Sequence, residues 1–173
     1  MNLLKLLGIR KPLSKKELIK NGAQIGENFH NYGTIDKGHC YLLIIGDNVT
    51  LAAGCRVLLH DASTKKIFGY SKTGIVFIGN NVFVGSQAII LPNVRIGSNV
   101  IIGAGAVVSK DIPDNSVVAG NPARVIHSYD CFVQKNTSLF NSRPHFKKHY
   151  SKKTLSEKEE ERNLLFDGIG FDL

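Results

Sequence analysis

The sequence predicts an all-β fold, a parallel β-solenoid built from six-residue repeats. Three observations support this prediction. An aliphatic residue recurs at every sixth position from Ile78 to Val108, a small or β-branched residue follows each at the fifth position, and Asn or Gly is frequent at the fourth. An amphipathic helix would need an apolar period of about 3.6 residues, which this pattern does not show.

Each position of the six-residue unit has its own physical role. The first and fifth positions are expected to face the interior. The fourth is expected to form a corner, because Asn and Gly adopt positive φ more readily than other residues. The same grid runs earlier through Ile45, Leu51 and Val57, and once at Ile25. We therefore expect one solenoid domain over residues 23–126.

Outside the grid, two capping boxes predict short helices. Ser14 and Glu17 open the first, which should end near Gly22; Ser156 and Glu159 open the second, a helix near 156–166. Residues 127–155 are basic and show no regular pattern. We therefore expect a basic arm with a short helix at 1–22 and a C-terminal extension at 127–173. The helices are expected to cap the open ends of the solenoid.

The formal net charge is +8 in 173 residues, but the excess is unevenly placed. Residues 1–20 hold six Lys or Arg against one Glu, whereas the repeat region is nearly neutral. A nucleic-acid-binding protein would concentrate basic residues on its folded face, so that class is excluded. The leucine-rich basic arm has two interpretations, a packed cap on the first coil or a weak peripheral contact with an anionic membrane.

The cysteines indicate the compartment. Cys40, Cys55 and Cys131 are widely spaced and form no C-x-x-C motif. An odd number of thiols without a framework is typical of a reducing environment. The apolar start is short and lacks the features of a signal peptide, so we expect a cytoplasmic protein.

The grid breaks once, after His60. In register, His60 would occupy a corner and Asp61 an inward position, where a carboxylate is costly to bury. The coil must therefore open, and residues 61–77 form an irregular excursion of the kind that often carries function. His60 is either a corner residue or a general base, and Asp61 either orients an imidazole, contacts a substrate or is merely solvated.

The stretch from Ile78 to Ile126 resembles the hexapeptide-repeat acyltransferases. Its closing segments, Gly103-Ala104-Gly105, Ser109-Lys110-Asp111-Ile112-Pro113 and 119–126, are similar to the galactoside, maltose and polysaccharide O-acetyltransferase branch. The resemblance implies a left-handed β-helix with three hexads per coil, and a homotrimer. It also implies acetyl-CoA as co-substrate and a sugar hydroxyl as acceptor, in capsule, lipopolysaccharide or other surface-polysaccharide biosynthesis.

The resemblance also implies roles for individual residues. His60 would be the catalytic base. The positions that match the donor-binding motif would lie along the pantetheine arm or meet the phosphates of the nucleotide end, the latter through Lys110 and Arg124; they are Ser86, Ala104, Ser109, Lys110 and Arg124. Polar groups for the acceptor are expected in the region of Asn31, Tyr32 and Asp36, and at Asp61. Surface roles are expected for the remaining histidines: His30, His39, His127, His145 and His149.

Two other classes of protein share this fold. A zinc site of the γ-carbonic anhydrase type needs a close H-x₄-H pair, which the sequence lacks, so no metal is expected. A non-enzymatic trimeric scaffold stays open, because motif retention does not prove turnover. Within the enzymes, N-acetylation of an amino sugar is the alternative to O-acetylation.

Overall fold

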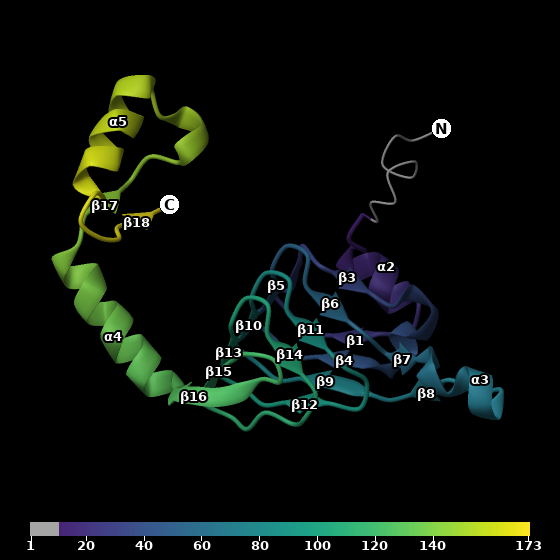
Figure 1. Ribbon diagram of the computed structural model, residues 1–173. Helices are drawn as coiled ribbons and strands as arrows, with labels where there is room; N and C mark the ends of the chain where they lie inside the picture. The colour runs from purple at the N-terminus through teal and green to yellow at the C-terminus, as the bar shows by residue number, and fades with distance from the viewer. Residues whose placement is uncertain (1–10) are drawn as a thin grey trace, which may run out of the picture. The chain divides into compact units, whose positions relative to one another are not determined.

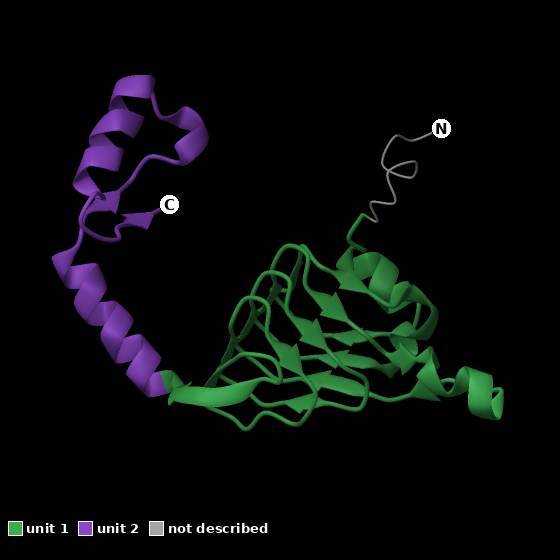
Figure 2. Cartoon of the chain, in the orientation of Figure 1, with its two compact units in different colours: residues 1–129 green, residues 130–173 purple. Residues whose placement is uncertain are grey.

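The computed structural model describes residues 11–173, so residues 1–10 of the predicted arm lie outside the described residues. The chain divides into two compact units, one up to Tyr129 and one from Asp130 to Leu173 (Figure 2). The first contains the repeats and the second the C-terminal extension. Each is described by itself.

The first unit is a solenoid with three faces of parallel strands (Figure 1). Face A consists of β1 (Gln24–Ile25), β4 (Leu43–Ile45), β9 (Val76–Ile78) and β12 (Arg95–Ile96). Face B consists of β2 (His30–Asn31), β5 (Val49–Leu51), β10 (Val82–Val84), β13 (Val100–Ile102) and β15 (Ser116–Ala119), with β16 (Arg124–Ser128) antiparallel at its end. Face C consists of β3 (Thr34–Ile35), β6 (Arg56–Val57), β11 (Ile89–Ile90) and β14 (Val107–Val108).

The burial pattern confirms the inward columns. Every first-position residue from Ile45 to Val108 is at most 3% exposed, and so is every fifth-position residue from Val49 to Ala106. Ile25 is partly buried and packs against this core. Each coil buries apolar side chains against the coils above and below it. The interior is therefore one continuous apolar column, as expected for a repeat that cannot cover its hydrophobic side alone.

The corners are also where the sequence predicts them. The fourth-position asparagines have φ between 52° and 61°, and Gly54 and Gly105 have φ of 73° and 69°. Gln87 takes the same conformation at φ 59°, although its residue type did not mark it as a corner. The backbone at this column turns through the left-handed region whichever residue occupies it.

Asparagine amides form a ladder along the edge between faces A and B. Asn28 donates to Asn48, Asn48 to Asn81, Asn81 to Asn99, and Asn99 to Asn115, with N···O distances of 2.9–3.0 Å. All four hydrogen bonds run in the same direction along the solenoid axis. They link the coils through side chains in addition to the backbone hydrogen bonds of the sheets.

The first helix follows the sequence prediction closely. The helix α2 (Lys15–Lys20) has Ser14 as its N-cap and a complete capping box with Glu17. It ends at Asn21, one residue before Gly22, whose φ is 95°. Leu18 of this helix is fully buried, so α2 packs on the first coil.

The excursion leaves the coil as a small antiparallel hairpin. β7 (His60–Asp61) pairs with β8 (Lys72–Thr73), and η2 (Ala62–Thr64) and α3 (Lys65–Phe68) lie between them. The coil resumes with β9, which begins at Val76, one residue before the end of the excursion predicted over 61–77. A second irregular piece, η1 (Lys37–Leu42), interrupts the first coil.

The second unit contains α4 (Tyr129–Ser142, beginning at the last residue of the first unit), β17 (His145–Phe146), η3 (Tyr150–Lys152), α5 (Leu155–Leu164) and β18 (Phe171–Asp172). The expectation of irregular structure over 127–155 was wrong, because α4 occupies much of that stretch. The second capping box uses Thr154 and Glu157 rather than Ser156 and Glu159, because the T-x-x-E pattern two residues earlier starts the helix first. That α5 caps the solenoid stays a prediction. Within residues 11–173, no helix is both long enough and apolar enough to cross a bilayer.

Candidate active site

His60 lies where the chain leaves face C. Val57 and Leu59 are both fully buried, so the strand alternation continues past β6 instead of turning a corner. His60 consequently projects outward as the first residue of β7. It is not among the residues with positive φ, and the interpretation of His60 as a corner residue is therefore wrong.

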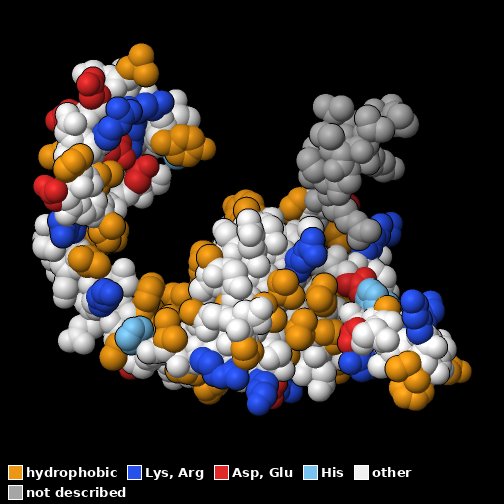
Figure 3. Space-filling model, viewed as in Figure 1, with side chains coloured by type: hydrophobic (Ala, Val, Ile, Leu, Met, Phe, Trp, Pro, Cys, Tyr) orange, Lys and Arg blue, Asp and Glu red, His pale blue; other side chains and the backbone are white. Residues whose placement is uncertain are grey.

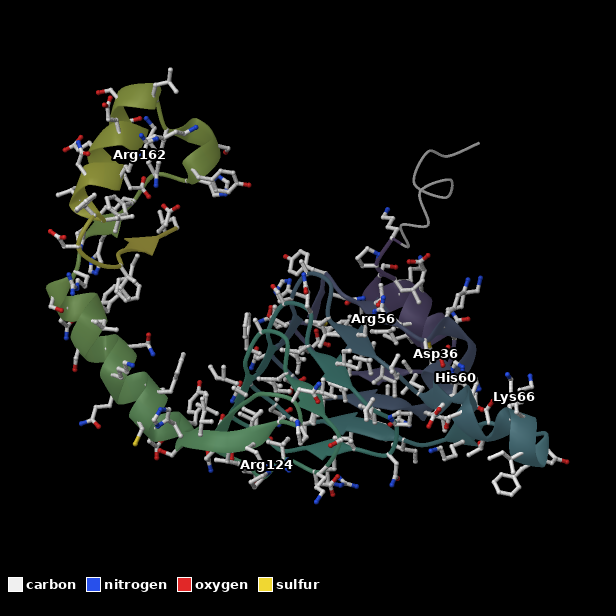
Figure 4. The ribbon with its side chains drawn as sticks, in the orientation of Figure 1. Asp36, Arg56, His60, Lys66, Arg124 and Arg162 are labelled. Atoms are coloured by element: carbon white, nitrogen blue, oxygen red, sulfur yellow. The ribbon has the colours of Figure 1, made fainter. Side chains whose placement is uncertain are left out.

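Asp36 reaches the same place from the preceding coil. It follows β3, which pairs with β6 in the register Ile35 to Val57. This pairing places Asp36 beside the end of β6, from which His60 also emerges (Figure 4). Asp36 then begins η1, where its Oδ1 accepts the N–H of Gly38 at 3.2 Å.

A single carboxylate oxygen joins two imidazoles at this position. Asp36 Oδ2 is hydrogen-bonded to Nδ1 of His60 and lies 3.0 Å from Nδ1 of His39. The two rings stack with centroids 4.7 Å apart and an interplanar angle of 28°. Because Nδ1 of His60 is hydrogen-bonded to Asp36, Nε2 is the ring nitrogen left to accept a proton from a substrate. Nε2 has no hydrogen-bond partner among residues 11–173.

The electrostatics of Asp36 favour its ionised form. Partial burial alone would raise the pKa of Asp36, but hydrogen bonds and charge from His60 and His39 outweigh it and hold the pKa below its ordinary value. The side chain of Asp36 is 16% exposed, against 41% for that of His60. The carboxylate is thus a shielded acceptor, and the imidazole above it is open to solvent.

Asp61 does not orient His60. Its carboxylate lies 2.7 Å from Nζ of Lys72 and accepts the N–H of Ser63 at 2.8 Å. The hydrogen bond from Lys72 is the largest cause that lowers the pKa of Asp61 to about 2. Of the three interpretations of Asp61, the one in which it orients the imidazole is wrong, because Asp36 holds that position.

The expected surface role of His39 was also wrong. His39 is half-buried against His60 and Asp36. The remaining histidines lie elsewhere: His30 contacts Asn28, His145 stacks on Phe140, His149 contacts Ser151, and His127 is exposed in β16.

The same three side chains also bear on metal binding. Asp36, His39 and His60 each bring one donor atom within 4.8 Å of the others, a set of types that transition ions accept. The prediction of no metal rested on spacing along the sequence, and the coil brings together histidines that are 21 residues apart. The direct contact of Nδ1 of His60 with Asp36 is that of a hydrogen bond, and it accounts for the arrangement without an ion.

Two of the predicted acceptor residues differ in environment. Both polar atoms of Asn31 are used within the chain, since Nδ2 donates to the carbonyl of Leu13 and Oδ1 accepts from the N–H of Gly33. Tyr32 is 59% exposed. The structure thus gives Asn31 a role in holding the segment before α2, and leaves Tyr32 free to contact another molecule.

All five predicted donor residues are exposed, and four of them lie on two edges. Ser86 and Ala104 follow β10 and β13, on the edge between faces B and C. Ser109 and Lys110 follow β14, on the edge between faces C and A that also carries His60. Arg124 begins β16, toward the opposite end of the solenoid from His60 (Figure 4).

The fold and site together define a class: a β-solenoid acyltransferase, with a carboxylate-held histidine where the coil opens. Comparison with known proteins supports this class. A family model described as bacterial transferase hexapeptide (six repeats) matches residues 76–110. Protein CapG of Staphylococcus aureus is 43% identical over 140 residues, covering 76% of this chain and 80% of its own.

Two further relatives carry an activity in their names. Galactoside O-acetyltransferase of Escherichia coli K12 is 42% identical over 107 residues. The aligned part is 59% of this chain and 52% of that enzyme. The crystal structure of a maltose O-acetyltransferase from Clostridium difficile 630 aligns with a TM-score of 0.50 and 36% identity, covering 64% of this chain and 72% of that one. The chain belongs to the hexapeptide-repeat acetyltransferase family, in its sugar O-acetyltransferase branch, and has the left-handed β-helix of that family.

Proposed function

We propose that the protein transfers the acetyl group of acetyl-CoA to a hydroxyl of a sugar in the biosynthesis of a surface polysaccharide. The observation that carries this proposal is the pair formed by His60 and Asp36 where the coil opens, in a chain of an acetyltransferase family. The names of the galactoside and maltose enzymes support a sugar hydroxyl as the acceptor.

The geometry supports a direct transfer with His60 as general base. The acceptor oxygen attacks the thioester carbonyl while its proton passes to Nε2 of His60. Asp36 holds the Nδ1–H tautomer and stabilises the imidazolium that forms. The tetrahedral intermediate then breaks its C–S bond, and the proton on Nε2 passes to the sulfur to release CoA as a thiol.

The separation of the donor residues supports an active site between subunits. Ser86 and Ala104 lie on a different edge from His60 and Lys110. The solenoid of a single subunit therefore cannot bring all four residues to the same acetyl-CoA molecule. In a homotrimer, the His60 edge of one subunit would face the Ser86 edge of its neighbour. Along face B, β5 in the coil of His60 and β16, which Arg124 begins, are four strand spacings apart, about 19 Å. This is a suitable path for an extended donor whose phosphates meet Lys110 and Arg124.

We place the reaction in the cytoplasm, where thiols stay reduced; the buried thiols of Cys40 and Cys55 are free. Figure 3 shows hydrophobic and basic side chains gathered on the excursion beside the site. Ile67 and Phe68 are 75% and 67% exposed there and adjoin Lys65 and Lys66.

The test uses the purified chain with acetyl-CoA and a panel of sugars and glycan precursors. Release of free thiol gives the rate, and base lability of the product distinguishes an ester from an amide. His60→Ala should lower kcat by ~10²–10⁴, because it removes the base, and leave KM for acetyl-CoA nearly unchanged. His30→Ala is the matched control. If His60→Ala keeps more than about a tenth of native kcat, His60 is not the base.

A further inference from the structure

His39 makes contacts that the mechanism above does not use. It lies in η1, where its own backbone departs from helical geometry at φ −124° and ψ 20°. This departure brings the imidazole to the Asp36 carboxylate and onto the ring of His60. The ring of Tyr41 lies 6.2 Å from that of His39, measured between centroids.

The carboxylate of Asp36 is fully committed by this arrangement. Oδ1 accepts the N–H of Gly38, while Oδ2 accepts from His60 and His39. His39 thereby adds a restraint at Oδ2 to the one that Gly38 provides at Oδ1. It also covers one face of the His60 ring.

We propose that His39 is a positioning residue for acyl transfer. It fixes the Asp36 carboxylate with one hydrogen bond and the plane of the His60 ring by stacking, so that Nε2 of His60 points steadily to the acceptor oxygen. This inference rests on the proposed role of His60 as the base. His39 itself touches neither substrate nor the atoms that react.

The physical need for such a residue follows from the exposure of His60. Its side chain is 41% exposed and is attached to a two-residue strand that the solenoid core does not cover. A single hydrogen bond at Nδ1 leaves the imidazole ring free to tilt, which would change the direction of Nε2. A stacked partner bonded to the same oxygen removes this freedom. Misplacement of a reacting group by about 1 Å can cost ~10²-fold in rate.

Three variants separate the two contacts. His39→Asn keeps an N–H donor near the position of Nδ1 and removes the ring; His39→Phe keeps the ring and removes the donor; His39→Ala removes both. We expect His39→Ala to lower kcat by about 10- to 100-fold, and the other two to lie between it and the native protein. KM for acetyl-CoA should change by less than about twofold, because the donor residues are untouched.

The outcomes separate this inference from the proposed function. Native turnover that is lost in His60→Ala but unaffected by all three His39 variants would overturn the inference and leave the function standing. Full activity in His60→Ala would overturn both. Circular dichroism and melting temperature check that each variant folds, and partial rescue by Asn or Phe relative to Ala supports positioning over a general structural defect. If chelation abolishes native activity and Zn²⁺ restores it, the three residues are metal ligands and the inference fails.

Discussion

Replacing Asp36 by Asn tests whether the partly buried carboxylate, rather than the histidine alone, makes the base effective. The substitution keeps the size of the side chain and its ability to cap η1 through Gly38, since Asn caps as well as Asp. It removes the negative charge beside Nδ1 of His60. A hydrogen bond to a charged group contributes about 1.5–3 kcal/mol. At about 1.36 kcal/mol for each tenfold in rate, kcat should fall about 10- to 150-fold.

The assay is thiol release from acetyl-CoA with saturating acceptor, with KM for each substrate measured separately. The loss should fall on kcat, because the imidazolium needs the carboxylate only as it forms. Asp47→Asn is the matched control: Asp47 also accepts a backbone N–H, from Glu27, but lies on the edge between faces A and B. If Asp36→Asn retains more than about half of native kcat, the carboxylate does not assist the base and the reasoning is wrong.

Further perturbations test the donor site, the core and the C-terminal unit. Lys110→Ala and Arg124→Ala should each raise KM for acetyl-CoA with little change in kcat; unchanged KM in both would place the nucleotide end elsewhere. Ile90→Ala should lower the free energy of unfolding by about 2–5 kcal/mol in urea titrations, since Ile90 is fully buried between coils. The hydrogen bond from Lys148 is the largest cause that lowers the pKa of Glu157 to about 2. Its support of α5 is therefore complete above its ordinary pKa and lost as pH falls toward 2. Amide exchange in α5 should speed up over that range in the native protein, and should depend less on pH there in Glu157→Gln once intrinsic exchange is subtracted; the ion pair of Glu161 with Lys153 remains in both.

The repeat made the solenoid predictable in detail. The strictly spaced pairs, such as Ile90 and Val108, are 18 residues apart and adjacent in register, so three hexads make one coil. The inward columns and the corners could be read directly because each position has one backbone conformation and one environment. Gln87 shows the limit, since nothing in its residue type marks it as a corner.

The contact between Asp36 and His60 could not be read in the same way. Ile35 pairs with Val57, a separation of 57 − 35 = 22 residues instead of 18, because η1 adds residues to that coil. Counting hexads therefore misplaces the first coil against the second. Asp61, which follows His60 in the sequence, was one of the predicted partners of the imidazole, whereas the partner in space, Asp36, comes from the preceding coil. The signal that could have found it was the Asp-x-x-His spacing of Asp36 and His39, which puts a carboxylate and an imidazole within one turn.

The asparagine ladder makes the three edges of the solenoid unequal. The edge between faces A and B is bonded twice from coil to coil, by the sheets and by the chain of amides. The edge between faces C and A carries no such chain in the described residues; instead it bears His60, and there the coil opens into the hairpin of β7 and β8. Local opening takes place where fewest bonds must break. Fluctuations of the solenoid should consequently be larger at the His60 edge, where we propose that the acceptor enters, than at the edge between faces A and B, where the ladder holds the register of the coils.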